Sequence, residues 1–255
     1  MNILVIGDIF AKPGRMAISQ LLPNLIKENK IDFIIANGEN ICHGKGINIK
    51  SYDLLIKENI DVITSGNHIF KNKEVDELFK NYKNILRPAN WYKGVPGHGS
   101  VLVEKNNIKI RVTNIMGKVF MDYCNNPYEA MDKIIALNDW DIHIVDFHGE
   151  ASAEKIAFAY NYDGVISGVV GTHTHVQTAD NRILPKGTGF ITDIGMTGCY
   201  ESIIGADIAS ILEKEKFNKT ISIKPAKGNF QLCGVILAFK NNILNTIKRI
   251  NIKSM

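Results

Sequence analysis

The stretch Ile3-Leu4-Val5-Ile6-Gly7-Asp8 decides the fold class. A short apolar run rich in β-branched residues is typical of a strand buried on both faces, and the Gly-Asp pair ends it. An apolar run followed by a polar, glycine-containing loop returns at residues 33–40 and 62–68. Segments with helical periodicity lie between these runs. The alternation predicts a parallel sheet with functional residues at the carboxyl ends of its strands.

Further elements follow from periodicity and turn residues. Helices are expected at residues 16–26, 52–57, 73–82, 127–137 and 152–160, and Pro23 should kink or split the first of them. Alternating residues 100–104 and 108–112 predict a hairpin. Strands are expected at 142–147, 164–170, 190–194, 232–239 and 243–250, the last three giving a second sheet. We therefore expect residues 1–255 to form a single α/β domain of two packed sheets flanked by helices.

The composition is that of an ordinary globular protein. Hydrophobic residues make up 45% and charged residues 22% of 255 residues, and the net charge of +4 comes from scattered lysines, which gives no sign of a DNA-binding surface. The four cysteines form no CxxC pair, so reduced thiols are expected. The N-terminus reads as a buried strand rather than a signal peptide, and no apolar run could span a bilayer. We expect a cytoplasmic protein without a membrane partner, and the sequence leaves a homo-oligomer open.

Potential metal ligands recur at the predicted strand ends. They are Asp8, Glu39, Asn40, Asn67, His148, His173 and His175. A single sheet edge would bring them together. Imidazole, carboxylate and amide ligands without thiolate favour manganese, iron, cobalt or zinc. Seven ligands are too many for one catalytic zinc, but they suit two ions roughly 3.5 to 4 Å apart that share a bridging carboxylate.

Such a pair of ions is suited to phosphoester hydrolysis. It polarises phosphoryl oxygens and turns a bound water into hydroxide near neutral pH. We expect this hydroxide to attack phosphorus in line. His68 follows Asn67 directly and remains as an imidazole that can protonate or stabilise the leaving oxygen.

Each of these residues alone has an ordinary structural explanation. Asp8 alone would be a helix cap or turn residue, and His148 alone a core histidine. The combination at five strand ends favours the metal site. His98 and His143 are assigned structural roles. His43 is left open as a residue of the substrate pocket, although its loop is interpreted mainly through its glycines, and the Gly44/Gly46 pair lacks the Walker spacing of a phosphate loop.

The motifs Asp8, Gly66-Asn67-His68, His148 and Gly171-Thr172-His173-Thr174-His175 resemble the motif series of calcineurin-like metallophosphoesterases. This resemblance implies a four-layer αββα fold and a dinuclear centre. Phe10 stands where most of that superfamily has the histidine of Asp-x-His, and Gly38-Glu39-Asn40 replaces the usual aspartate. Both departures match the bacterial YmdB-like branch. The branch also has sequences similar to segments 87–90, 114–117, 147–151, 177–180 and 192–198. The resemblance therefore runs from residue 1 to about residue 240.

The resemblance divides the ligands between two ions. One ion would take Asp8, Glu39 and His175, with Asn40 replacing the missing histidine. The other would take Glu39, Asn67, His148 and His173. His68 would be the catalytic imidazole, and iron or manganese the expected metals.

The resemblance also implies a substrate class. It points to a phosphodiesterase acting on cyclic nucleotides, notably 2′,3′-cyclic nucleotides, with a link to RNA turnover. The residues alone leave open a phosphomonoesterase or nuclease with the same metals. They also leave open a metal-stabilised regulatory or RNA-associated protein with little catalysis. No substrate-binding residue is identified from the sequence.

Overall fold

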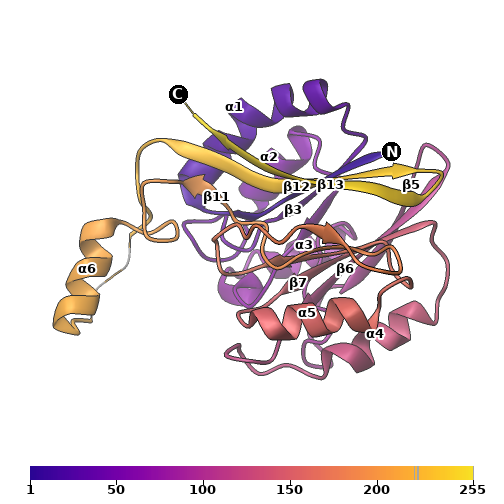
Figure 1. The fold of residues 1–255 in the computed structure, drawn as a ribbon. Coiled ribbons are helices and arrows are strands. Elements are labelled where there is room, and N and C mark those ends of the chain that lie inside the picture. The colour runs from indigo at the N-terminus through magenta and orange to yellow at the C-terminus, as the bar shows by residue number, and fades with distance from the viewer. Residues whose placement is uncertain (221, 223, 255) are drawn as a thin grey trace.

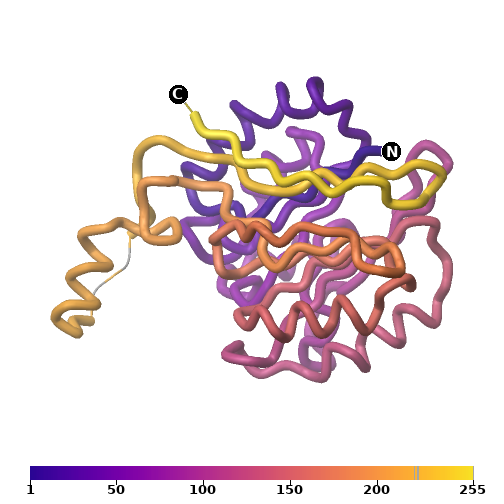
Figure 2. The backbone as a smooth tube through the Cα atoms, in the orientation of Figure 1, coloured from indigo at the N-terminus to yellow at the C-terminus, as the bar shows by residue number. Residues whose placement is uncertain are grey.

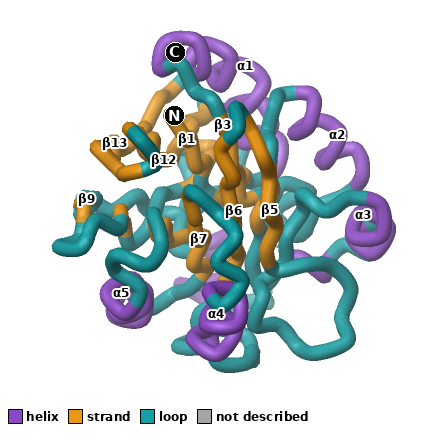
Figure 3. Tube along the Cα trace, turned by 90° about the vertical axis from the view of Figure 1, so that its right-hand side faces the viewer, coloured by secondary structure: helices purple, strands orange, loops and turns teal. Residues whose placement is uncertain are grey.

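Two mixed sheets pack face to face and carry helices on both outer faces (Figure 1). The computed structural model describes residues 1–220, 222 and 224–254, so residues 221, 223 and 255 of the expected domain lie outside it. The view in Figure 3 shows the layers from the side, with α1 and α2 above the strands and α4 and α5 below them. The predicted four-layer αββα fold class is confirmed.

The first sheet contains the N-terminal strands. Its order is β2 (Asp8–Ile9), β11 (Met196–Cys199), β12 (Phe230–Lys240), β1 (Asn2–Ile6), β3 (Phe33–Asn37) and β4 (Val62–Thr64), and β13 (Ile243–Lys253) pairs with β12. Strands β1, β3 and β4 are parallel, whereas β12 runs antiparallel to β1. The helices that follow these strands are α1 (Ala11–Asn29), α2 (Ile49–Lys57), the 3-10 turn η1 (Ile69–Lys71) and α3 (Val75–Asn81).

The second sheet is built from the middle of the chain. Its order is β5 (Ser100–Lys105), β6 (Ile108–Met116), β7 (Ile142–His148), β8 (Gly168–Thr172), β10 (Gly189–Ile191) and β9 (Arg182–Ile183). Its outer helices are α4 (Pro127–Ile135) and α5 (Ser152–Asn161). A further helix, α6 (Ile208–Phe217), has no buried residue and projects from the body (Figure 1).

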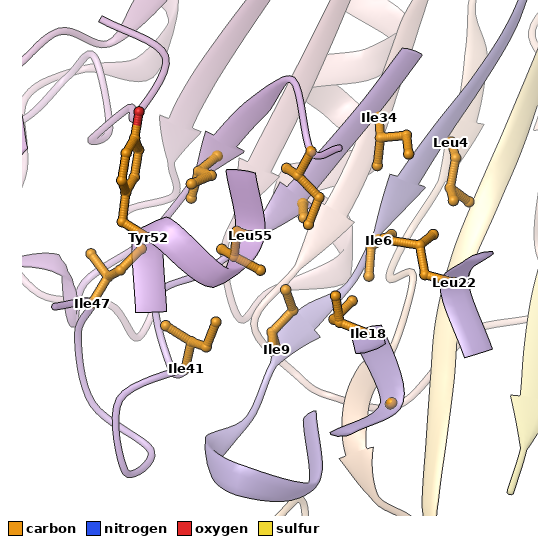
Figure 4. Packing of buried hydrophobic residues seen from close by; sticks show 14 of the residues in the cluster. Leu4, Ile6, Ile9, Ile18, Leu22, Ile34, Ile41, Ile47, Tyr52 and Leu55 are labelled. Carbon is orange, nitrogen blue, oxygen red and sulfur yellow. The ribbon is translucent and has the colours of Figure 1, made fainter. Parts of the chain in front are cut away.

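Alternation along the strands divides the apolar side chains among three cores. Leu4 and Ile6 of β1 face the helices and pack with Leu22 of α1 (Figure 4). Ile3 and Val5 face the other way, into the core between the two sheets. A third core lies between the second sheet and its helices. Because neighbouring side chains of a strand point to opposite faces, a strand buried on both sides supplies two cores at once.

One prediction about the sheets is wrong. Residues 232–239 and 243–250 were expected in the second sheet, but β12 pairs with β1, placing Ile3 opposite Leu237, and β13 follows β12. Figure 2 shows this yellow hairpin running beside the indigo N-terminal strand. The strand expected at residues 190–194 is the shorter β10, which pairs with β8 and β9 and not with the C-terminal hairpin, so the three segments expected in one sheet are divided between two. Pairing of segments more than two hundred residues apart leaves no local signal in the sequence.

Smaller differences have local causes. Helix α1 runs through Pro23 without interruption. Pro23 has no N–H to donate to the carbonyl of Ser19, but both residues lie on the exposed side of the helix. The strand expected from residue 164 begins only at Gly168, because Gly164 has a positive φ of 82° and belongs to a turn. Elements β2, β9, β11 and α6 were not predicted. Among the described residues, no helix is long and apolar enough to cross a membrane.

Candidate metal centre

The ends of strands from both sheets meet at one place. Asp8 lies in β2, Glu39 and Asn40 follow β3, and Asn67 and His68 follow β4 of the first sheet. From the second sheet, His148 ends β7, and His173 and His175 follow β8. The expectation of one sheet edge is therefore wrong. The two sheets pack face to face, and each contributes part of the cluster from its strand ends.

Four donor groups converge on one point. One ligand atom each from Glu39, His148 and His173 lies within 4.8 Å of the other two. His148 Nε2 is 3.3 Å from Glu39 Oε1 and 3.1 Å from His173 Nδ1. Asn67 Oδ1 lies 3.3 Å from the same Nε2 atom. These are the residues that the resemblance assigns to one ion.

The other expected ligands lie beside this group. Asp8 Oδ1 is 3.9 Å from His175 Nε2 and 3.9 Å from His148 Nδ1. Asn40 Nδ2 donates to Glu39 Oε1 at 3.0 Å and lies 3.2 Å from His175 Nε2. Asn40 Oδ1 accepts a hydrogen bond of 2.8 Å from His68 Nδ1. Asn40 therefore joins the ligand cluster to the expected catalytic imidazole.

Each clustered histidine turns one ring nitrogen outward. His148 Nδ1 lies 2.9 Å from Thr172 Oγ1, and His175 Nδ1 donates to the carbonyl of Ile204 at 2.8 Å. His173 Nε2 lies 3.3 Å from Glu150 Oε2. An outer acceptor holds the proton on one nitrogen and leaves the lone pair of the other for a metal.

The buried charges of the cluster depend on one another. Burial would raise the pKa of Glu39, but the charge and hydrogen bond of His148 lower it to about 2. Burial would lower the pKa of His148, but the carboxylate of Glu39 raises it to about 9. Burial raises the pKa of Asp8 to about 6. Without an ion, a protonated histidine supplies the positive charge that these buried carboxylates need.

Two structural features indicate that the cluster is suited to hold metal ions. Asp8 Oδ1 is fully buried and has no hydrogen-bond partner among the described residues, which is costly for a carboxylate unless a cation binds it. A Cβ atom at Gly66 would overlap the ring of His148 and the carboxylate of Glu39. The buried imidazole, carboxylate and carboxamide groups are the donors that divalent transition metals take.

A cavity of about 600 Å³ adjoins the cluster. Its wall includes Phe10, His43, Lys45 and His68, together with His173 and His175. Cavities of roughly 300 to 1,000 Å³ hold small organic ligands. His43 thus lies on the cavity wall, which is the alternative that the sequence left open for it. His143 is buried in β7 against Thr113, and His98 lies in an exposed loop.

The sequence did not reveal the residues that support the ligands. Lys155 is fully buried in α5 and reaches Asp193 at 3.1 Å and the Thr172 carbonyl at 2.8 Å. Asp193 in turn accepts a 3.0 Å hydrogen bond from the backbone of Thr174. The pair fixes the loop in which His173 and His175 have φ values of 102° and 66°. A lysine within a helical pattern gives no sign of burial.

Asp146 is also buried beneath the cluster, where it accepts hydrogen bonds from Asn37 and Thr172. The sequence did carry a signal for this residue. It is the one carboxylate within the predicted strand Ile142–Phe147, whose other polar residue is His143.

Comparison with known proteins identifies the family of this chain. The model of the YmdB-like protein family matches residues 4–250. A 2′,3′-cyclic-nucleotide 2′-phosphodiesterase of Bacillus subtilis is 42% identical over 97% of this chain and 95% of its own length. A crystal structure of a hypothetical protein from Thermus thermophilus superposes with a TM-score of 0.96 at 36% identity, over all of both chains. The structure of a phosphatase from Mycoplasma pneumoniae has a TM-score of 0.94 at 35% identity, over 99% of this chain and 93% of that one. The chain therefore belongs to the YmdB-like protein family.

Proposed function

We propose that residues 1–255 act as one domain and form a dinuclear metal-dependent phosphodiesterase for 2′,3′-cyclic nucleotides. The observation that carries the proposal is the convergence of the expected ligands from both sheets, beside a buried oxygen of Asp8 that has no hydrogen-bond partner in the described part of the chain. The 42% identical relative named for this reaction supports the substrate class. The adjoining cavity has the size of a nucleotide site.

The ligands divide into two overlapping sets. Glu39, Asn67, His148 and His173 would hold one ion, and Asp8, Glu39 and His175 the other. Asn40 supports both sets through its contacts with Glu39 and His175. The donor set suits manganese, iron, cobalt or zinc, of which iron and manganese are the expected metals; when bound, such ions would supply Lewis-acid polarisation of the phosphoryl oxygens and make water a nucleophile near neutral pH.

His68 is placed to handle the leaving oxygen. Hydrolysis joins the water oxygen to phosphorus, breaks the bond between phosphorus and O2′, and gives O2′ a proton. His68 lines the cavity, and its Nδ1 is occupied by Asn40. Nε2 is then the nitrogen that can hold a proton beside the substrate. Such general acid catalysis contributes roughly 100- to 10,000-fold to the rate.

The test is hydrolysis of 2′,3′-cyclic AMP by the protein loaded with Mn²⁺, with the products separated by chromatography. Cleavage of the O2′ bond gives 3′-AMP as the expected product. His68→Ala should lower the rate by about 100-fold or more while Mn²⁺ still binds. His98→Ala, in an exposed loop, is the matched control and should retain the rate.

Two outcomes would refute the proposal. Intact cyclic nucleotide after incubation with wild-type protein that carries two bound ions per chain would exclude this substrate. Faster turnover of p-nitrophenyl phosphate than of bis(p-nitrophenyl) phosphate would favour the phosphomonoesterase alternative.

A further inference from the structure

Asp146 shares a strand face with the ligand His148. Val145 and Phe147 of β7 point into the core beneath the second sheet, so Asp146 and His148 point to the opposite face, between the sheets. Asp146 is only 1% exposed, and no cation of the described residues pairs with it. Hydrogen bonds must therefore satisfy this carboxylate.

Three donors from three other strands meet the carboxylate. Thr172 Oγ1 of β8 donates to Asp146 Oδ1 at 2.7 Å. Asn37 Nδ2 of β3 donates to Oδ2 at 3.0 Å, and the hydroxyl of Thr64 in β4 donates to the same oxygen. Since β3 and β4 belong to the first sheet, Asp146 ties the two halves of the metal centre together.

The direction of these bonds fixes the tautomer of His148. A threonine hydroxyl has one proton, and a carboxylate can only accept. Thr172 gives its proton to Asp146, so in its 2.9 Å bond with His148 Nδ1 the ring must be the donor. Nδ1 then keeps its proton, and Nε2, which faces Glu39, Asn67 and His173, is the nitrogen whose lone pair would bind an ion.

We propose that Asp146 is a positioning residue, which acts through Thr172 to hold His148 in the tautomer that binds metal through Nε2. The inference rests on the proposed metal centre. Outer partners of this kind typically change metal affinity by 10- to 100-fold. Asp146→Asn would break the pattern, because an amide group would replace one of the two acceptor oxygens.

A matched pair of variants separates this role from a structural one. Thr172→Val removes the hydroxyl between Asp146 and His148, whereas Thr172→Ser keeps it. Thr64→Val removes another hydrogen bond of Asp146 that does not lead to His148. The readouts are the Mn²⁺ dissociation constant by titration calorimetry and the thermal unfolding of the metal-free proteins. Neither readout depends on catalysis.

Thr172→Val is expected to weaken Mn²⁺ binding by about 10- to 100-fold. The Mn²⁺ dissociation constants of Thr172→Ser and Thr64→Val should stay within about threefold of the wild-type value. This holds even where Thr64→Val lowers the unfolding temperature as much as Thr172→Val does. Equal losses of affinity in Thr64→Val and Thr172→Val would overturn the inference, as would unchanged affinity in Thr172→Val. Wild-type protein that binds no Mn²⁺ would overturn the proposed function and the inference together.

Discussion

Gly66→Ala should block the metal centre without changing a single ligand. The backbone of Gly66 does not have a positive φ, so alanine is conformationally acceptable there. The added methyl group, however, would overlap both the His148 ring and the Glu39 carboxylate. Both side chains are fully buried and held by hydrogen bonds, so they have little room to retreat.

The size of the effect follows from this geometry. Forcing one extra methyl into a packed site costs about 1–3 kcal/mol of folding free energy. For a chain of this length each kcal/mol lowers the unfolding temperature by about 2–4 °C, so the protein remains folded at 25 °C. Shifting a positioned group by about 1 Å can cost about 100-fold in rate. We expect Gly66→Ala to lower activity and metal affinity by about 100-fold or more while the protein stays folded.

Gly168→Ala is the matched control. Its added methyl would lie 3.3 Å from Leu237 Cδ1 and 3.4 Å from Ile144 Cδ1, which are ends of flexible side chains. Mn²⁺ per chain, measured by mass spectrometry after dialysis, would be compared with cyclic nucleotide turnover and thermal unfolding. Equal metal content and turnover in both variants would refute the inference that the missing side chain of Gly66 makes room for the His148 ring and the Glu39 carboxylate.

Three further changes test other parts of the structure. Asn67→Ala should lower bound Mn²⁺ from two ions per chain to one with little effect on unfolding, and undiminished binding would contradict its place as a ligand. Lys155→Met leaves Asp193 buried without its partner and should lower the free energy of unfolding, measured in urea, by about 3–5 kcal/mol. Lys105→Met removes the partner of Asp61 in a partly exposed pair and should lower it by about 1 kcal/mol or less. Burial lowers the pKa of His143 to about 3, so only the unfolded chain takes up a proton there as pH falls below about 6.5. The contribution of His143 to the free energy of unfolding should therefore drop by about 1.4 kcal/mol per pH unit between pH 6 and 4. In urea unfolding, His143→Gln should lack this contribution, and parallel pH profiles of the variant and wild type would contradict it.

The residues that the sequence identified share one feature, their place at the end of a strand. Apolar runs at residues 3–6, 33–36 and 62–64 were found because strands buried on both faces need unbroken apolar sequence. The polar residues that follow them then fall on the carboxyl ends of parallel strands. The structure brings all seven expected ligands and His68 into one cluster, and the family comparison agrees with the motif series.

The supporting residues had no comparable signal. Lys155 and Thr172 look ordinary in the sequence, and their burial depends on which sheet covers them. Helix α6 has no buried residue, and it was not predicted although Ile208, Ile211 and Leu212 stand at helical spacing.

The sequence by itself determined the strand and helix alternation, the positions of the ligands and the kind of chemistry they suit, because these depend on short-range periodicity and residue type. Only the tertiary structure decided that the C-terminal hairpin joins the N-terminal sheet and that the metal centre draws on two sheets. It also decided that Asp146 connects them through Thr172. Such pairings are chosen by packing and hydrogen bonding between distant segments, which no local pattern records.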